Sequence, residues 1–112
     1  MTFAAVRKLA LGLDGVAEGL SYRTPDFKAR GQLFARFHQD GEWLVVRVDF
    51  ARRAALLAEE PGIYTLTDHY ENYPWILIRV AVCPPAVMRA RLREAHALAL
   101  ASAKPAGKKR AR

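Results

Sequence analysis

The chain has 112 residues, enough for one domain that buries a single core without disulfide bonds. Its 18 Lys and Arg residues against 11 Asp and Glu residues give a net charge of +7, but five of these basic residues lie in residues 104–112, where there is no acid. No apolar run approaches the roughly 20 residues of a membrane span, and the N-terminus lacks the basic, apolar and small-residue segments of a signal peptide. The single cysteine, Cys83, cannot form an internal disulfide. We therefore expect a cytoplasmic protein.

The basic excess is concentrated at the C-terminus. Residues 1–102 are predicted to form one domain, and residues 103–112 combine Pro, Gly and basic residues without a large apolar side chain, which predicts a disordered tail. A basic tail attracts nucleic-acid phosphates, which makes Lys108, Lys109 and Arg110 candidate contacts. A purely solubilising terminus is the alternative.

The first third of the chain predicts a helix followed by short strands. Apolar residues recur at helical spacing over residues 3–13, and Gly12 or Gly15 ends this helix. Residues 20–23 and 26–30 then resemble two strand segments that Thr24-Pro25 interrupts.

The next segment is typical of a β-hairpin. Residues 33–38 and 43–48 are rich in aromatic and branched side chains, and Asp40-Gly41 between them favours a type I′ turn. The resulting register gives one apolar face with the pairs Phe37–Leu44, Ala35–Val46 and Leu33–Val48. The other face has the pairs His38–Trp43, Arg36–Val45 and Phe34–Arg47.

The second half predicts a helix, two strands and a last helix. Asp49 suits the N-cap of a helix over residues 50–59, with Leu56 and Leu57 facing inward. Residues 63–67 and 75–82 are typical of strands, and Ile76, Ile78 and Val80 share one face of the second strand. Pro84 and Pro85 suit the first turn of a helix that ends near Ala101.

This order predicts an α+β fold of two layers, an antiparallel sheet with helices on one face. The opposite sheet face would then carry Phe34, Arg36, His38, Trp43, Val45, Arg47, Trp75, Leu77 and Arg79. Three interpretations remain open for this aromatic and basic face. It is covered by loops or the last helix, it contacts a protein or a second copy of the chain, or it stacks the bases of single-stranded nucleic acid.

The candidate catalytic groups form no recognisable constellation. His38, His69 and His96 lie far apart without metal-ligand spacing, and we expect His38 and His96 at the surface. Cys83 has no basic neighbour, which favours a structural thiol, and Asp68-His69 favours a hydrogen bond that orders the loop. We therefore predict no catalytic residue, no metal, no cofactor and no enzymatic activity.

Several segments together resemble the MmcQ/YjbR family. They are Thr24 to Lys28, Gly31 to Ala35, Leu44 to Asp49, His69-Tyr70 and Tyr73 to Ile78, and the resemblance spans roughly residues 3–101. It implies a fold related to secretion-chaperone-like and frataxin-like domains. Members of this family are commonly described as predicted DNA-binding proteins, which by position makes candidates of Lys28, Arg30, Arg36, Arg47, His69 and Tyr70. Gln32 departs from the lysine of many relatives.

The function predicted from these observations is weak DNA binding that depends mainly on phosphate contacts, without enzymatic activity. Arg79 would assist the basic candidates, and Phe34, Trp43 and Trp75 would supply aromatic surface. The alternative is a protein-interaction or small-ligand module that uses the same sheet face, with a homodimer as one form of it.

Overall fold

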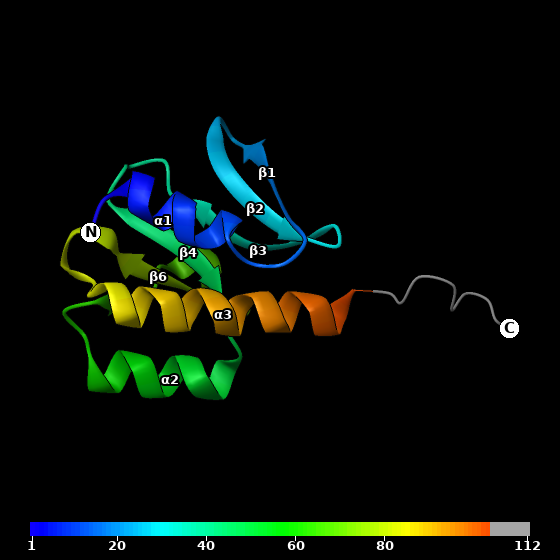
Figure 1. The fold of residues 1–112 in the computed structure, drawn as a ribbon. Helices are drawn as coiled ribbons and strands as arrows, with labels where there is room; N and C mark the ends of the chain where they lie inside the picture. Colours follow the sequence, from blue (N-terminus) through cyan, green and yellow to red (C-terminus); the bar gives the residue numbers. More distant parts are fainter. Residues whose placement is uncertain (104–112) are drawn as a thin grey trace, which may run out of the picture.

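A computed structural model describes residues 1–103, which form one sheet and three long helices (Figure 1). The elements follow in the order α1 (Phe3–Leu11), β1 (Val16–Ser21), β2 (Thr24–Ala29), β3 (Gln32–Phe37), β4 (Trp43–Arg47), α2 (Phe50–Glu59), β5 (Tyr64–Thr65), the 3-10 turn η1 (Asp68–Tyr70), β6 (Trp75–Arg79), the 3-10 turn η2 (Val80–Val82) and α3 (Pro85–Ser102). The predicted α+β fold is confirmed. Apart from Ala103, which is buried, the predicted tail lies outside the described residues.

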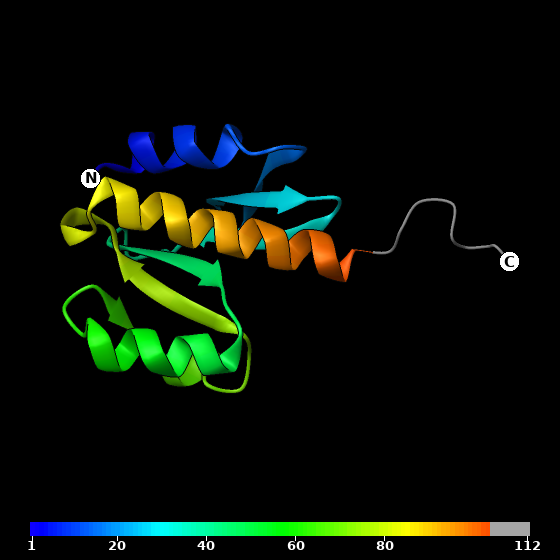
Figure 2. The same cartoon turned by 60° about the horizontal axis from the view of Figure 1, so that its bottom comes forward.

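The six strands lie in the order β1-β2-β3-β4-β6-β5, and all neighbours are antiparallel. One row across the sheet contains Phe27, Ala35, Val46 and Ile76 and defines the helix face. The helix α3 crosses this face over β2, β3 and β4, α1 packs against α3 and β1, and α2 lies beside β5 (Figures 1 and 2). The next row, with Asp26, Arg36, Val45 and Leu77, defines the far face.

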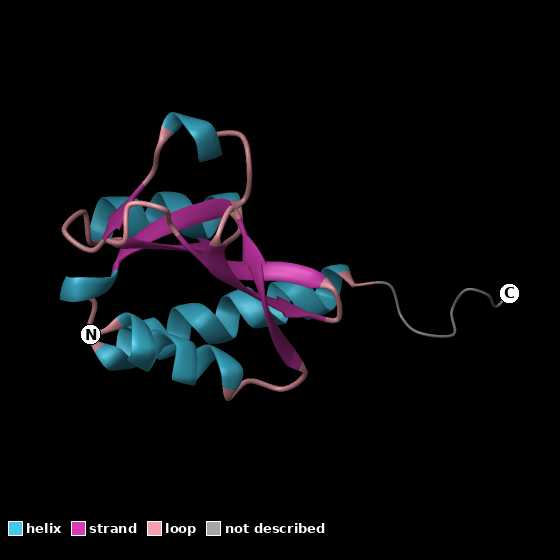
Figure 3. Ribbon diagram, turned by 90° about the horizontal axis from the view of Figure 1, so that it is seen from above, coloured by secondary structure: helices cyan, strands magenta, loops and turns pink. Residues whose placement is uncertain are grey.

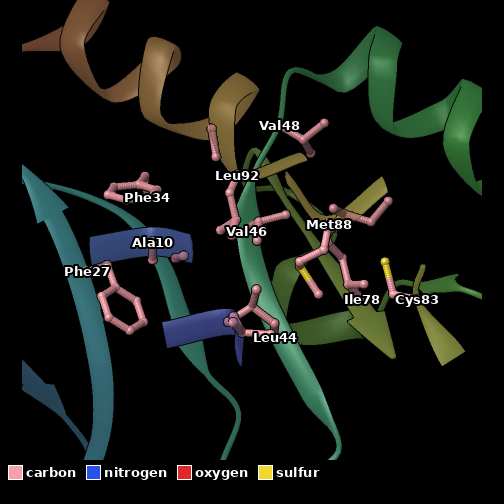
Figure 4. Close-up of a cluster of buried hydrophobic side chains, with 14 of the residues drawn as sticks. Ala10, Phe27, Phe34, Leu44, Val46, Val48, Ile78, Cys83, Met88 and Leu92 are labelled. Carbon is pink, nitrogen blue, oxygen red and sulfur yellow. The ribbon is translucent and has the colours of Figure 1, made fainter. Parts of the chain in front are cut away.

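The core lies between the sheet and α3. Fully buried side chains from β2, β3, β4 and β6 meet Val6 and Ala10 of α1 and Met88 and Leu92 of α3 (Figure 4). Both outer helices are capped as the sequence predicts, since α1 ends before Gly12 and the Asp49 carboxylate accepts the Arg52 N–H at 2.7 Å. Local capping and the apolar rows therefore place the helices on one face.

The first hairpin differs from the prediction. Residues 16–21 form β1, and Thr24-Pro25 belongs to β2 instead of interrupting a strand, with Tyr22-Arg23 as the turn. Proline is tolerated here because the ladder between β2 and β3 stops at Asp26–Arg36, so no β3 carbonyl requires an N–H from Pro25.

The hairpin of β3 and β4 has the predicted register but a different turn. The pairs Phe37–Leu44, Arg36–Val45 and Ala35–Val46 form, and the ladder ends there, so the predicted pairs Leu33–Val48 and Phe34–Arg47 do not. A type I′ turn needs positive φ at both central residues, yet only Gly41 has one, at +81°. The Gly41 N–H donates to the His38 carbonyl at 3.1 Å, which makes the connection longer than predicted.

A β-bulge moves Phe34 to the other side of the sheet. Phe27 pairs with Ala35 and Lys28 pairs with Leu33, which leaves Phe34 as an extra residue in β3. The bulge turns its ring onto the helix face, where it is fully buried and lies 5.6 Å from the His96 ring. Both predictions, a Phe34 on the far face and a His96 at the surface, are therefore wrong, since His96 is buried and bonds the Asp14 carbonyl at 2.7 Å.

The two strands of the second half are shorter than predicted. The chain is extended only over residues 64–65 and 75–79, and Val80 reaches the core from η2 instead of from a strand. The connection between β5 and β6 folds back over the far face, and Figure 3 shows its short turn on the side of the sheet away from α1 and α3. Over the residues described, no helix has both the length and the apolar character that crossing a membrane requires.

Candidate functional site

A polar pocket of about 330 Å³ opens on the far face. It forms where the turn between β1 and β2, the end of β3 and the connection around η1 meet. Its lining is polar and aromatic and consists of Tyr22, Arg36, His38, Gln39, Thr67, His69 and Tyr70. Four other pockets, of about 570, 190, 400 and 300 Å³, have no buried charged side chain in their lining.

Arg36 is the buried cation of this pocket. It lies in the middle of the sheet, between Asp26 of β2 and Val45 of β4, and only 9% of its surface is exposed. Its guanidinium donates to the Tyr70 hydroxyl and, at 3.4 Å, to the Phe37 carbonyl. The guanidinium carbon also lies 5.6 Å from the ring centre of Tyr22 and 5.9 Å from that of Tyr70, which adds cation–π attraction to both rings.

The charge of Arg36 is not neutralised by a direct ion pair. Among residues 1–103, no carboxylate lies within 4.0 Å of its guanidinium. Asp26 is its register neighbour, but one carboxylate oxygen accepts the Ser21 hydroxyl and the other has no hydrogen-bond partner. An anion in the pocket would compensate the desolvation of this positive charge. The site therefore favours a negatively charged ligand.

Tyr22 stands at the rim on a strained turn. Tyr22 and Arg23 have φ of +51° and +70°, a left-handed conformation that costs roughly 1 kcal/mol for a residue with a Cβ. The ring gains little burial in return, because 75% of Tyr22 is exposed. The strain instead holds one face of an aromatic ring toward Arg36 and leaves the rest of the ring accessible.

The opposite wall is held by Arg53 of α2. Its guanidinium donates to four backbone carbonyls of the connection between β5 and β6, those of Tyr70 (3.2 Å), Glu71 (2.8 Å), Tyr73 (2.7 Å) and Trp75 (3.3 Å). Tyr70 is thereby kept over the far face, where it packs with Val45 and Leu77. We call these four hydrogen bonds the Arg53 latch. They fix Tyr70 in its position above Arg36.

Two histidines complete the polar rim. The His69 ring lies 4.7 Å from the Tyr70 ring, edge to face, and His38 lies 3.2 Å from the Asp40 carboxylate. Burial alone would raise the pKa of Asp40, but the Glu42 N–H and His38 bond its carboxylate and hold the pKa below the ordinary value. Within the described chain, no side-chain hydrogen bond joins Asp68 to His69, and no group of three His, Cys, Asp or Glu side chains could hold a metal ion.

The structure brings together only some of the predicted site residues. Arg36, His69 and Tyr70 meet in the pocket, and Lys28 and Arg30 are exposed in β2 and in the following turn. Trp43 and Trp75 are half-buried against the cluster of Val45, Tyr70 and Leu77. Lys108, Lys109 and Arg110 lie outside the described residues.

Three predicted contacts are engaged elsewhere. Phe34 is in the core, as described above. Arg47 donates to the Ser102 hydroxyl at 2.9 Å at the end of α3. Arg79 pairs with Glu42 at 3.1 Å and lies 4.5 Å from the centre of the Trp43 ring, so its charge is already used within the protein.

Sequence reasoning missed Tyr22, Gln39, Thr67 and the latch residue Arg53. Nothing in the sequence marks Tyr22-Arg23 as a turn, because neither residue favours positive φ. Arg53 did carry a signal, since it precedes the inward Leu56 by three residues and therefore shares its helix face. An arginine on an apolar helix face indicates a buried polar partner.

A larger hollow, of about 570 Å³, lies between α1 and α3. Its lining is mainly apolar, and its charged members, Lys8, Arg89 and Arg93, are all exposed. It contains no buried polar group that would orient a ligand. The smaller pocket around Arg36 is therefore the better candidate site, because fixed polar groups give a pocket its specificity.

Cys83 is expected to be an unreactive thiol. The side chain is buried in the core, and burial raises the pKa of its thiol above the ordinary value, so little reactive thiolate forms at neutral pH. We expect iodoacetamide at pH 8 to label the native protein on the order of 100-fold more slowly than the protein in concentrated urea. Equal rates in the two conditions would show an accessible, activated thiol.

The sheet, its one helix-covered face and the pocket on the other face define a two-layer α+β domain. The same fold occurs in the crystal structure of the Deinococcus radiodurans protein DR2400, assigned to the domain family DUF419. The two chains superpose with a TM-score of 0.80 over 96% of this chain and 85% of that one, at 19% sequence identity.

Residues 11–98 match the YjbR family model, so this chain belongs to the YjbR family. Among curated proteins, it is 45% identical over 42 residues to the uncharacterized proteins Mb2600 of Mycobacterium bovis and Rv2570 of Mycobacterium tuberculosis. The match covers 37% of this chain and only 33% of each of those proteins.

Proposed function

We propose that this protein binds DNA without enzymatic activity and that phosphate contacts supply most of the affinity. The observation that carries the proposal is Arg36, a buried cation that faces an open polar pocket and has no carboxylate within ion-pair distance in the described chain. Such a group favours an anionic ligand, and nucleic acid presents its phosphates to proteins in this way.

Exposed basic residues on β2 and on the turns at its two ends support a strand that extends beyond the pocket. Lys28 and Arg30 are exposed on β2 and on the turn after it, and Arg23 is exposed beside Tyr22. The basic residues of 104–112 add positive charge in the sequence. Arg47 and Arg79 are omitted from the proposed interface because Ser102 and Glu42 already engage them.

The protein-interaction alternative has less support. This alternative requires an accessible apolar surface on the far face. The connection around η1 instead covers Val45 and Leu77, which are almost fully buried. A small anionic ligand would use the same pocket as DNA. We prefer DNA because the accessible cations extend beyond the pocket to Arg23, Lys28 and Arg30.

The test is a fluorescence-anisotropy titration of labelled DNA at two salt concentrations, with the full chain and with residues 1–103. If about three phosphates are contacted, raising salt from about 50 to 200 mM should weaken single-strand binding roughly 20-fold. Residues 1–103 should keep measurable binding at the lower salt concentration. Binding that disappears with residues 104–112 would contradict the proposal for the folded domain.

A reversed charge on β2 tests the proposed path of the strand, and a reversed charge on α1 is the matched control. Lys28→Glu should weaken binding, because Lys28 lies exposed in β2 near the proposed path, whereas Lys8→Glu, on α1 at the other side of the sheet, should not. Equal losses for the two variants would indicate only a response to net charge.

A further inference from the structure

The pocket around Arg36 has two features that a general phosphate contact does not require. It has a depth that buries the cation, and it has an exposed aromatic ring at the rim. Together they indicate which part of a nucleic acid enters. The inference below rests on the DNA binding proposed above.

The guanidinium of Arg36 still has hydrogen-bonding capacity toward the pocket. Its hydrogen-bond partners within the described chain are the Tyr70 hydroxyl and the Phe37 carbonyl, and its Nε donates to neither. Among buried side-chain atoms of the described chain, only Asp26 Oδ1 and Arg91 Nε lack both solvent and a partner. Arg36 Nε therefore keeps some accessible surface and an N–H without a protein partner, on a residue that lines the pocket.

Tyr22 provides a second contact for the ligand, an exposed aromatic ring. The backbone places this ring in a left-handed turn, where glycine would be free of strain, and leaves 75% of the residue exposed. One part of the ring faces Arg36 at 5.6 Å, and the exposed remainder can stack against a planar group. A ligand that satisfies both residues carries a phosphate and, a few ångströms away, an aromatic base.

The size of the pocket limits this ligand to a single nucleotide. A volume of about 330 Å³ is at the lower end of the range for small-molecule sites and has room for one nucleotide, not for a duplex. A base inside a duplex is stacked on both faces, so it cannot offer a face to Tyr22 without leaving the helix. An unpaired base is stacked by aromatic side chains at little cost.

We propose that this pocket holds one unpaired nucleotide of a DNA strand, with its phosphate on Arg36 and its base stacked on Tyr22. Tyr70 and the connection held by Arg53 form the fixed wall opposite Tyr22. The protein then prefers single-stranded DNA, or the unpaired end of a duplex, to a continuous duplex.

The experiment compares a labelled single strand of about 12 nucleotides with the blunt duplex that this strand forms with its complement, using the full chain. The wild-type protein should bind the single strand about 10-fold more tightly. Tyr22→Asn should remove this preference and leave duplex binding unchanged. Asparagine accepts positive φ, so the turn is kept, and circular dichroism checks the fold.

Tyr73→Asn is the matched control, because Tyr73 is also an exposed tyrosine, at 57%, and its side chain lies outside the pocket. It should leave both affinities unchanged. Equal wild-type binding to the single strand and the blunt duplex, or a Tyr22→Asn variant that keeps the preference, would overturn this inference while DNA binding stands. Absence of binding to either DNA would overturn the proposed function as well.

A free nucleotide carries the same phosphate and base as a nucleotide in a DNA strand. A competition experiment distinguishes the two ligands. Deoxyadenosine 5′-monophosphate should displace the single strand only at millimolar concentration, because it lacks the neighbouring phosphates that reach Lys28 and Arg30. Displacement at the concentration where the oligonucleotide itself competes would instead assign the pocket to free nucleotides and overturn the assignment to a strand.

Discussion

Replacement of Arg53 by methionine should lower the free energy of unfolding by about 3 to 5 kcal/mol. Arg53 is 9% exposed and its guanidinium donates to four backbone carbonyls between residues 70 and 75, so methionine would fill part of the space but satisfy none of them. Urea denaturation followed by circular dichroism measures the loss. Hydrogen exchange should show faster exchange at the Tyr70, Tyr73 and Trp75 amides, whose bonds lie within this connection.

Arg52→Met is the control for this prediction. Arg52 precedes Arg53 on the same helix, but its side chain is 41% exposed and makes only a 3.5 Å ion pair with Glu94. Such a surface pair contributes less than about 1 kcal/mol. Similar losses for the two variants would mean that the latch contributes nothing beyond an ordinary helix arginine. Arg53→Met should also weaken DNA binding, since it releases Tyr70 from its position above Arg36.

Replacement of Phe34 by alanine should lower the free energy of unfolding by about 3 to 5 kcal/mol as well. The ring is fully buried on the helix face and packs edge to face on His96 of α3, so its removal leaves a cavity between the sheet and that helix. Urea denaturation again gives the value. If Phe34 were on the far face, as the alternation of β3 predicts, the loss would be far smaller.

Phe50→Ala provides the comparison. Phe50 is 50% exposed at the start of α2, where its ring lies 4.7 Å from the Arg53 guanidinium carbon. Its removal deletes one cation–π contact and little buried area, so we expect a loss of about 1 kcal/mol. A Phe34→Ala variant no less stable than Phe50→Ala would contradict the bulge in β3.

The sequence predicted the features that depend on local chemistry. Asp49 caps α2 because its carboxylate reaches the N–H three residues on, and the strand register of β3 and β4 follows from the alternation of apolar residues. Placing Arg36 on the face opposite the helices was correct for the same reason.

What the sequence could not predict depends on contacts between distant segments. The bulge at Phe34 is set by how β3 pairs with β2, and no pattern within β3 reveals it. The covering of Arg36 by Tyr70 requires the connection around η1 to fold back, and that connection has no periodicity. Tyr22 lines the pocket because it lies in a turn with positive φ, and neither Tyr22 nor Arg23 favours that conformation. Only the three-dimensional arrangement therefore identifies the pocket.

The way Arg53 holds the connection between β5 and β6 has a consequence for sequence variation. All four of its contacts there are to backbone carbonyls, so none of them depends on which side chains the connection carries. Glu71, Asn72 and Tyr73 are exposed, and relatives can exchange such residues without losing the latch. One arginine can thus preserve the shape of this wall while its chemical surface diverges. Thr67 and His69 of the same connection line the pocket, so these two positions are the ones to randomise when ligand preference is to be redesigned.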